Sequence, residues 1–199
     1  MSKKKGLLIV ISGPSGVGKK TVLTPLMNDK SLNLAYSISM TTRPKRFDEI
    51  HGKDYFFLTK KEFEQQIKDG NLLEWAIYVD NYYGTPKDYV NNLRKEGKNV
   101  LLEIEPQGAL LIMDYAKKHN DHRFLTVFVA PQSLEHLKLR LLKRATESEE
   151  KIHKRIKQAE WELTLTNKYD YTVVNGDNPS DATKKLKDIL LKKINENVD

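Results

Sequence analysis

The sequence predicts an α/β fold in which a parallel sheet is flanked by helices. Four short apolar runs typical of buried strands recur along the chain, at residues 7–11, 99–104, 124–129 and 171–174. Segments with helical periodicity separate these runs. The alternation favours a parallel sheet, because parallel strands are joined by crossover connections that are usually helices.

The segment after the first run predicts a phosphate-binding loop of the P-loop NTPase type. Gly13 and Gly18-Lys19 have the spacing G-x-x-x-x-G-K between an apolar strand and a helix. Backbone N–H groups of such a loop, together with the helix N-terminus, bind phosphate oxygens. We therefore expect ATP to be bound by Gly13, Pro14, Ser15, Gly16, Val17, Gly18, Lys19, Lys20 and Thr21.

One position of this loop departs from the general motif. Lys20 stands where Ser or Thr reaches Mg²⁺, and the hydroxyl comes one residue later, at Thr21. We expect Mg²⁺ to be held mainly by phosphates and water. The five histidines show no metal-ligand spacing, so no protein metal site is predicted.

The composition limits the classes of function. The 34 Lys and Arg outnumber the 27 Asp and Glu, which suits either nucleic acid or a polyanionic small substrate. No RNP-like motif or zinc-finger spacing is present, so no nucleic-acid partner is expected. The chain has no cysteine, and its longest apolar run, residues 7–11, is too short to span a membrane. These features predict a soluble, cytoplasmic protein without a membrane partner.

Two interruptions break the alternation of strands and helices. Residues 37–43 alternate like a strand and are followed by aromatic-rich stretches and a short helical pattern at 62–68, which predicts an inserted, mixed α+β lobe. Residues 144–154 are dense in charge and predict a mobile flap. We also expect a helix at 133–143 capped by Ser133, and a last helix after Pro179 capped by Ser180.

Further motifs occur in a fixed order over nearly the whole chain. They are Ser12–Lys19, Thr41–Arg46, Gly52–Phe57, Glu74–Ala76, Asn81–Thr85, Gln107-Gly108, Ala130-Pro131, and the arginines Arg140, Arg144 and Arg155. In this order and spacing the chain resembles the guanylate kinase family, whose members transfer the γ-phosphate of ATP to GMP and dGMP. The resemblance implies one domain over residues 1–199, with a core (1–36, 90–139 and 156–199), a GMP-binding lobe (37–89) and a small helical lid (140–155).

The resemblance assigns the GMP site to the lobe. Guanidinium forks suit bidentate recognition of phosphate, so Arg43 and Arg46 are expected to hold the phosphate of GMP. Glu74 lies in an apolar stretch, a costly place for a carboxylate unless it meets donors, and guanine offers N1–H and N2–H. The remaining expected GMP ligands are Ser39, Tyr55, Tyr83, Thr85 and Glu105, the last at a position where the family usually has aspartate.

Catalysis is expected to depend on positioning and on neutralising charge, as in other phosphoryl transfers. The resemblance implies that the transition-state charge is shared by Lys19, Arg43, Arg46, Arg140, Arg144 and Arg155. It also implies that Asn175, at the end of a predicted strand, contacts the adenine of ATP. Asn-Gly also favours turns without any ligand.

Two other functions stay open at this point. Guanylate-kinase-like domains also occur as inactive modules that bind phosphopeptides, but these typically lose the phosphate loop that this chain keeps at Lys19. A P-loop kinase with another acceptor is the second alternative, and Glu74 together with Thr85 argues against it. The sequence leaves open whether the protein is a monomer or a homodimer.

Overall fold

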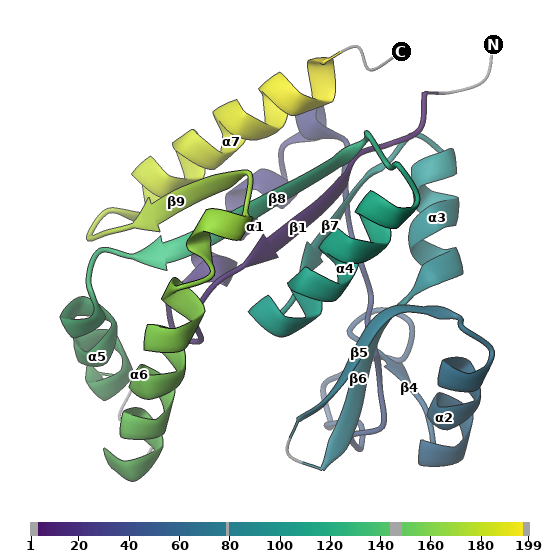
Figure 1. The fold of residues 1–199 in the computed structure, drawn as a ribbon, viewed down its shortest axis with the longest axis horizontal. Coiled ribbons are helices and arrows are strands. Elements are labelled where there is room, and N and C mark those ends of the chain that lie inside the picture. Colours follow the sequence, from purple (N-terminus) through teal and green to yellow (C-terminus); the bar gives the residue numbers. More distant parts are fainter. Residues whose placement is uncertain (1–3, 79, 144–148, 197–199) are drawn as a thin grey trace.

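The structure, a computed structural model, describes residues 4–78, 80–143 and 149–196. Its core is a five-stranded parallel sheet with the strand order β2-β7-β1-β8-β9 (Figure 1). The loop that follows β1 lies at the carboxyl edge of the sheet, where α/β proteins bind ligands. Since β1 is the middle strand, this loop lies at the middle of that edge. The strands are β1 (Leu8–Ser12), β2 (Leu34–Tyr36), β7 (Asn99–Glu103), β8 (Phe124–Pro131) and β9 (Tyr171–Asn175).

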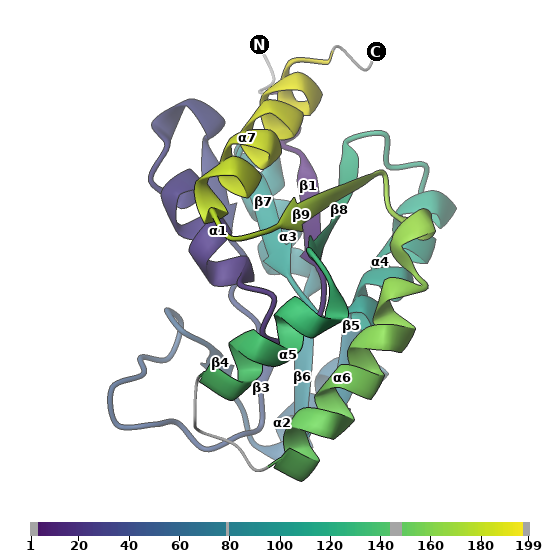
Figure 2. The same ribbon diagram turned by 90° about the vertical axis from the view of Figure 1, so that its left-hand side faces the viewer.

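Helices cover both faces of this sheet. On one face α1 (Lys19–Met27) packs against α7 (Pro179–Asn195), and on the other lie α3 (Lys87–Lys95) and α4 (Pro106–Lys118) (Figures 1 and 2). After β8, α5 (Leu134–Lys143) and α6 (Glu149–Leu163) pack against each other. None of the helices within the described ranges is long and apolar enough to cross a membrane.

The central strand has two buried faces and therefore reads as a continuous apolar run. Ile9 and Ile11 point into the hydrophobic cluster under α1 and α7, whereas Leu8 and Val10 point into the cluster under α3 and α4. All four side chains are essentially inaccessible to solvent. This double burial explains why the sequence shows no alternation of polar and apolar residues here.

A second sheet forms a lobe beside the core. Its strand order is β4-β3-β6-β5, with one parallel and two antiparallel pairings. The helix α2 (Lys60–Lys68) begins at a capping box between Thr59 and Glu62. Its buried Phe63 stacks on Tyr82 at 5.1 Å between ring centroids. The strands of the lobe are β3 (Met40–Thr41), β4 (Phe56–Phe57), β5 (Leu72–Tyr78) and β6 (Asn81–Pro86).

Most of the predicted elements are confirmed. The four predicted strands correspond to β1, β7, β8 and β9, and Ser133 does cap α5, since its Oγ accepts from the N–H of His136 at 3.0 Å. The strand β2 was not predicted because it has three residues and no buried side chain. In the stretch 37–43, only Met40–Thr41 is strand.

One local prediction is wrong. The last helix is capped by Asn178, whose side chain accepts from the N–H of Ser180, so Ser180 lies inside the first turn. The Asn side chain competes successfully because Pro179 occupies the first helical position. In the charged stretch 144–154, α6 begins at Glu149, and residues 144–148 lie outside the described ranges, so the mobile flap stays a prediction.

The proposed boundaries of the parts fall inside helices. The boundary at 89/90 lies within α3, and the boundary at 155/156 lies within α6. Both helices thus belong partly to the core and partly to the appended units. The division into core, lobe and lid stays a prediction.

A buried ion pair lies at the amino edge of the sheet, beside the segments that lead into β1 and β8. The guanidinium of Arg94 is 1% exposed and makes two hydrogen bonds to Asp121, at 2.5 and 2.9 Å. It also donates to the backbone oxygens of Gly6 (2.9 Å) and Arg123 (2.8 Å). One side chain from α3 thus fixes the segments that lead into β1 and β8.

Replacing Arg94 by alanine is expected to destabilise the protein by about 3–5 kcal/mol, because Asp121 then keeps only the more exposed ammonium of Lys5, at 3.2 Å, as an ionic partner. Denaturant unfolding monitored by circular dichroism measures this loss. The exposed neighbour Lys95 on the same helix is the control, and Lys95→Ala should change the free energy of unfolding little. Equal losses for the two variants would contradict the assigned role of Arg94.

The same pair predicts a dependence of stability on pH. Arg94 holds the pKa of Asp121 below its ordinary value of 3.8, although burial alone would raise it. The stabilisation is therefore complete above about pH 4 and is lost as the pH falls through the lowered pKa. When the free energy of unfolding is measured along a series of decreasing pH, Arg94→Ala should lose less stability than the unchanged protein.

Candidate functional site

The phosphate loop lies between β1 and α1, at the middle of the carboxyl edge of the sheet (Figure 2). Gly13 (φ 144°), Gly16 (φ 88°) and Gly18 (φ 95°) have backbone conformations that side chains rarely adopt. Gly13 also lies so close to β8 that a Cβ would come within 2.2 Å of the carbonyl oxygen of Val129. The glycines of the motif are therefore required by both conformation and space.

The lysine of the loop is folded back onto the loop itself. The ammonium of Lys19 donates to the carbonyl oxygens of Gly13 at 2.6 Å and Pro14 at 3.4 Å. These carbonyl groups hold the charge over the loop, where a phosphate would meet it. Lys20 and Thr21, which follow in the first turn of α1, are exposed.

A single backbone oxygen, that of Val17, holds the loop to two other elements. It accepts from Asn175 Nδ2 at 2.8 Å and from Arg140 Nη1 at 2.9 Å. Arg140 also donates through Nη2 to the backbone oxygen of Gly176. The conformation of the loop is thus tied to the end of β9 and to helix α5.

Asn175 contacts the loop and not solvent. It is 1% exposed, its Nδ2 is used on Val17, and a Cβ on Gly18 would come within 2.7 Å of that same Nδ2. In this structure the buried side chain of Asn175 holds the phosphate loop through its hydrogen bond to the backbone oxygen of Val17. Its predicted contact with adenine has no counterpart in this geometry and stays a prediction.

Two of the three predicted lid arginines reach the loop. Arg155, on α6, donates from Nη1 to Ser15 Oγ at 3.0 Å, and Arg140 contacts Val17 as described. Arg144 lies outside the described ranges. The positive charges of α5 and α6 are thus brought to the phosphate loop without any nucleotide.

In the lobe, Arg43 is held by an acidic residue that the sequence analysis missed. Glu49 accepts from Arg43 Nη2 at 2.6 Å and from Nη1 at 3.0 Å, and it also accepts from the backbone N–H of Arg46 at 2.8 Å. Glu49 raises the pKa of Arg43, and Arg43 lowers the pKa of Glu49. The sequence offered one signal for this role of Glu49, since it is an acidic residue three positions after Arg46, inside the same turn.

The aromatic residues predicted for the phosphate subsite surround Arg43. Its guanidinium lies 5.5 Å from the ring centroid of Tyr55 and 5.8 Å from that of Phe57. The rings of Tyr55 and Tyr83 are 6.2 Å apart, and the Tyr83 hydroxyl is a further hydrogen-bond partner of Arg43. Arg46, which is exposed, contributes its charge to this cluster.

The predicted guanine-reading pair forms inside the lobe. Glu74 is 9% exposed, and its Oε1 accepts from the hydroxyl of Thr85 at 2.6 Å across the β5–β6 pairing. Burial raises the pKa of Glu74, while the bond from Thr85 acts in the opposite direction. At Gly108, on α4, a Cβ would come within 2.9 Å of Glu74 Oε2, so any larger residue would require this carboxylate to shift.

The other predicted ligands of GMP lie at strand ends. Ser39 precedes β3 and accepts from the N–H of Phe56 through its backbone oxygen at 2.9 Å. Glu105 is exposed at the N-terminus of α4 and makes no capping bond. Its neighbour Glu103 accepts from the Tyr36 hydroxyl at 2.6 Å. The ATP residues and the GMP residues thus form two clusters on either side of the α4 N-terminus (Figure 1).

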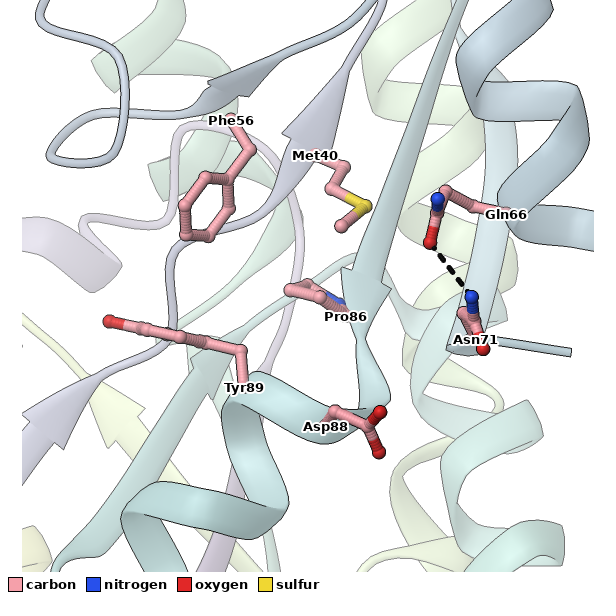
Figure 3. A pocket seen from close by; sticks show the side chains of 7 residues that line it. All are labelled: Met40, Phe56, Gln66, Asn71, Pro86, Asp88 and Tyr89. Carbon is pink, nitrogen blue, oxygen red and sulfur yellow. Dashed lines mark hydrogen bonds between the residues drawn. The ribbon is translucent and has the colours of Figure 1, made fainter. Parts of the chain in front are cut away.

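A cavity of about 180 Å³ lies elsewhere in the lobe (Figure 3). It opens where α2 and the start of α3 meet β3 and β6, and the edge-to-face contact of Phe56 and Tyr89 forms part of its wall. None of the predicted site residues lines it. The lining residues are Met40, Phe56, Gln66, Asn71, Pro86, Asp88 and Tyr89.

A phosphate loop with a lysine, facing a lobe that gathers two arginines and a buried Glu–Thr pair, defines a P-loop kinase of nucleoside monophosphates. Comparison with known proteins gives the family. A sequence model described as guanylate kinase matches residues 5–193. The chain therefore belongs to the guanylate kinase family, whose reaction is ATP + GMP → ADP + GDP, and the predicted activity and enzyme class are confirmed.

Curated guanylate kinases are similar over nearly their whole length. The chain is 48% identical to that of Malacoplasma penetrans over 97% of this chain and 96% of the relative. It is 50% identical to the guanylate kinase of Oceanobacillus iheyensis, over 96% of this chain and 89% of the relative. It is 49% identical to that of Bacillus subtilis, over 95% of this chain and 90% of the relative. This similarity to enzymes argues against the inactive-module alternative.

Solved structures confirm the predicted fold class. The crystal structure of guanylate kinase from Anaplasma phagocytophilum superposes with a TM-score of 0.74 at 30% identity, over 98% of this chain and 90% of that one. The SH3-kinase fragment of tight junction protein 3 superposes with a TM-score of 0.51 at 15% identity, over 98% of this chain and 60% of that one. The second likeness shows the fold alone.

Replacing Glu49 by glutamine is expected to raise the KM for GMP several-fold, because an amide offers Arg43 one acceptor in place of two. Steady-state kinetics with varied GMP measure the change, and the KM for ATP should stay the same. Asp48→Asn removes one negative charge from the adjacent exposed position and is the matched control. A KM for GMP that rises equally in both variants would contradict a specific role for Glu49.

Proposed function

We propose that this guanylate kinase binds ATP at the phosphate loop and GMP in the lobe, with the residues described above in the following roles. The observation that carries the proposal is the buried Glu74–Thr85 pair, because a desolvated carboxylate with one donor needs further donors. Guanine supplies two donors on one edge, N1–H and N2–H. The hydroxyl of Thr85 then turns toward O6, an acceptor that adenine lacks.

On the ATP side, the backbone N–H groups of residues 13–21 hold the β- and γ-phosphates. Lys19 exchanges the carbonyl oxygens of Gly13 and Pro14 for phosphate oxygens, a short movement for an ammonium that already lies over the loop. Asn175 and Arg140 support the loop through Val17 during this exchange. Lys20 and Thr21 provide a charge and a hydroxyl at the exposed start of α1.

Magnesium fits this site as a companion of ATP. Among the described residues, no group of three or more His, Asp or Glu side chains is gathered in a way that could hold a metal ion. Mg²⁺ keeps several waters and binds phosphates readily, so the phosphates and water are proposed as its ligands. When bound, it neutralises charge on the β- and γ-phosphate oxygens.

On the GMP side, Arg43 is held ready for a phosphate. Glu49 and the Pro44 carbonyl accept three hydrogen bonds from Nη1 and Nη2 of its guanidinium, and the Tyr83 hydroxyl is a further partner. Arg46 adds charge, and the hydroxyls of Tyr55 and Tyr83 complete the shell. Ser39 and Glu105 lie next to the guanine position and are proposed as secondary contacts to the base.

Transfer then depends on bringing the two clusters together. The lobe (37–89) and the lid (140–155) are proposed to close on the core, which aligns a phosphate oxygen of GMP with the γ-phosphorus of ATP and excludes water. Arg140, Arg144 and Arg155 share the transferred charge with Lys19, Arg43 and Arg46. No general base is needed, because the phosphate of GMP is already anionic near neutral pH. Since ATP and GMP are cytoplasmic metabolites, we place the enzyme in the cytoplasm.

The substrate assignment is tested by ADP release in the presence of ATP, Mg²⁺ and one acceptor at a time. GMP and dGMP should accelerate release strongly, whereas AMP, CMP and UMP should not, because they leave Glu74 unpaired. Acceleration by AMP or a pyrimidine nucleotide without acceleration by GMP would reject the assignment.

Replacing Lys19 by alanine is expected to abolish turnover while leaving GMP affinity largely unchanged, since Lys19 acts only on the ATP phosphates. Coupled ADP-release kinetics and GMP titration by calorimetry measure the two effects. The exposed Lys30 is the control, and Lys30→Ala should stay active. An active Lys19→Ala enzyme would refute the role of Lys19.

Replacing Glu74 by glutamine is expected to weaken GMP binding by about 100-fold, because the amide N–H₂ would face the donors of guanine. The carboxylate must be ionised to accept, and its pKa is raised. GMP affinity of the unchanged enzyme should therefore fall as the pH drops through that raised pKa, whereas the affinity of Glu74→Gln should not. Calorimetric GMP titrations along a pH series check both statements.

A further inference from the structure

The motif Gln107-Gly108 has no part in the reaction described so far, although Gly108 lies against the carboxylate that is proposed to bind guanine. Gly108 is the third residue of α4, which begins at Pro106. A Cβ on Gly108 would lie 2.9 Å from Glu74 Oε2, 3.3 Å from Glu74 Cδ and 3.6 Å from Glu74 Cγ. The space that a side chain would need at position 108 is therefore occupied by Glu74.

The backbone conformation of Gly108 does not require glycine. Gly108 is buried within α4, and its φ is not left-handed, unlike the φ of Gly13, Gly16 and Gly18 in the phosphate loop. At such a helical position alanine is the more favourable residue, because glycine loses more conformational freedom on folding. Glycine therefore costs helix stability here, and what it provides is room for Glu74.

The carboxylate of Glu74 has little freedom to move away from Gly108. Its other oxygen, Oε1, accepts from the hydroxyl of Thr85 at 2.6 Å, and Thr85 is itself fully buried. The preceding residue, Leu73, belongs to the buried hydrophobic cluster that also contains Ala109 of α4, so β5 is fixed against this helix. A methyl group at position 108 would therefore displace Oε2 or break the bond from Thr85.

An irregularity of β5 places two consecutive side chains beside α4. Successive side chains of a regular strand point to opposite faces of the sheet. The register of β5 against β6 shifts between Leu72 and Glu74, and a shift of this kind redirects side chains. Leu73 and Glu74 are accordingly both buried, Leu73 in the cluster under α4 and Glu74 with Oε2 at Gly108. The strand, Thr85 and Gly108 together thus set the position of the carboxylate.

The two oxygens of Glu74 face different groups of guanine in the proposed complex. Along the guanine edge the order is O6, N1–H and the 2-amino group. Because Thr85 lies at Oε1 and its hydroxyl is proposed to turn toward O6, Oε1 is the oxygen nearer to N1–H. Oε2, the oxygen beside Gly108, then faces the 2-amino group. A displacement of Oε2 would therefore act first on the bond from the 2-amino group.

We propose that Gly108 is a specificity-determining positioning residue, which leaves room for Glu74 Oε2 so that this oxygen accepts from the 2-amino group of guanine. The inference rests on the proposed function of Glu74. A site built around a hydrogen bond discriminates against an analogue that lacks the bond, and it does so only while its own acceptor is correctly placed. In this role Gly108 acts through Glu74 and forms no bond with the nucleotide itself.

Calorimetric titrations of Gly108→Ala with GMP and with inosine monophosphate, which lacks the 2-amino group, test the proposal. GMP affinity should fall about 10-fold, because the displaced oxygen accepts poorly from the 2-amino group. The affinity for inosine monophosphate should change by less than about threefold, since Oε2 has no partner there. Asp114→Ala, at an exposed position of the same helix, should alter neither affinity. Unchanged GMP affinity, or equal losses for the two nucleotides, would overturn the proposal.

Steady-state kinetics separate this role from a general structural one. In Gly108→Ala the KM for GMP should rise while the KM for ATP stays the same, because the phosphate loop does not contact position 108. An equal rise of both KM values would contradict a role through Glu74.

Shortening the carboxylate side chain gives a second test. Glu74→Asp removes one methylene and withdraws the carboxylate from position 108. In this background Gly108→Ala should weaken GMP binding by less than about threefold, compared with about 10-fold in the unchanged enzyme, because residues in contact have non-additive effects. Equal losses in the two backgrounds would overturn the proposal.

The double variant also covers the case in which Gly108→Ala does not fold. Gly108→Ala combined with Glu74→Asp should then fold, because the shorter side chain leaves room for the methyl group. If Glu74→Asp folds and the double variant does not, the space at position 108 is needed for another reason and the proposal is wrong.

The Glu74 variants distinguish this inference from the proposed function. If Glu74→Asp and Glu74→Gln both bind GMP as tightly as the unchanged enzyme, the role of Glu74 is wrong and the role of Gly108 falls with it. If both lose affinity while Gly108→Ala keeps it, only the role of Gly108 is wrong.

Discussion

The site depends on one backbone oxygen, that of Val17, and on the loop conformation that places it. The left-handed glycines turn the loop so that Asn175 and Arg140 both donate to this oxygen, at 2.8 and 2.9 Å. Gly13 presses the other end of the loop against β8. A phosphate cradle needs amide groups that already point at the ligand, and these contacts supply that order without any nucleotide. The same contacts connect the loop directly to α5 and β9.

Charged side chains of the site are held by other groups of the protein. Glu49 grips Arg43, Thr85 donates to Glu74, and the loop carbonyl groups hold Lys19. Each contact reduces the number of conformations that must be lost on binding, and each leaves part of the group's hydrogen-bonding capacity unused. The substrates therefore complete networks that are already partly built.

Much of the site could be predicted from short stretches of the sequence, because the signals for it lie within those stretches. The phosphate loop was predicted in full, since spacing, glycines and the preceding strand lie within fifteen residues and each has a physical cause. Arg43, Arg46, Glu74 and Thr85 needed the family resemblance, because a lone arginine or glutamate has no local signature. Glu49 was missed, since its role depends on side-chain contacts with Arg43 that a lone acidic residue does not announce. Ser180 was misassigned as a cap because two capping residues flank Pro179 and sequence alone does not choose between them.

What the sequence by itself determined is the class of fold, four of the five core strands, the phosphate loop and the family. Strand and helix periodicities, glycine conformations and motif spacings are short-range properties, so they can be read along the chain. Only the tertiary structure decided that Asn175 supports the loop from a buried position and that Glu49 holds Arg43. These facts depend on burial and on distances between residues far apart in sequence. Hydrogen bonding and charge compensation act through space, and the chain places their partners only when it folds.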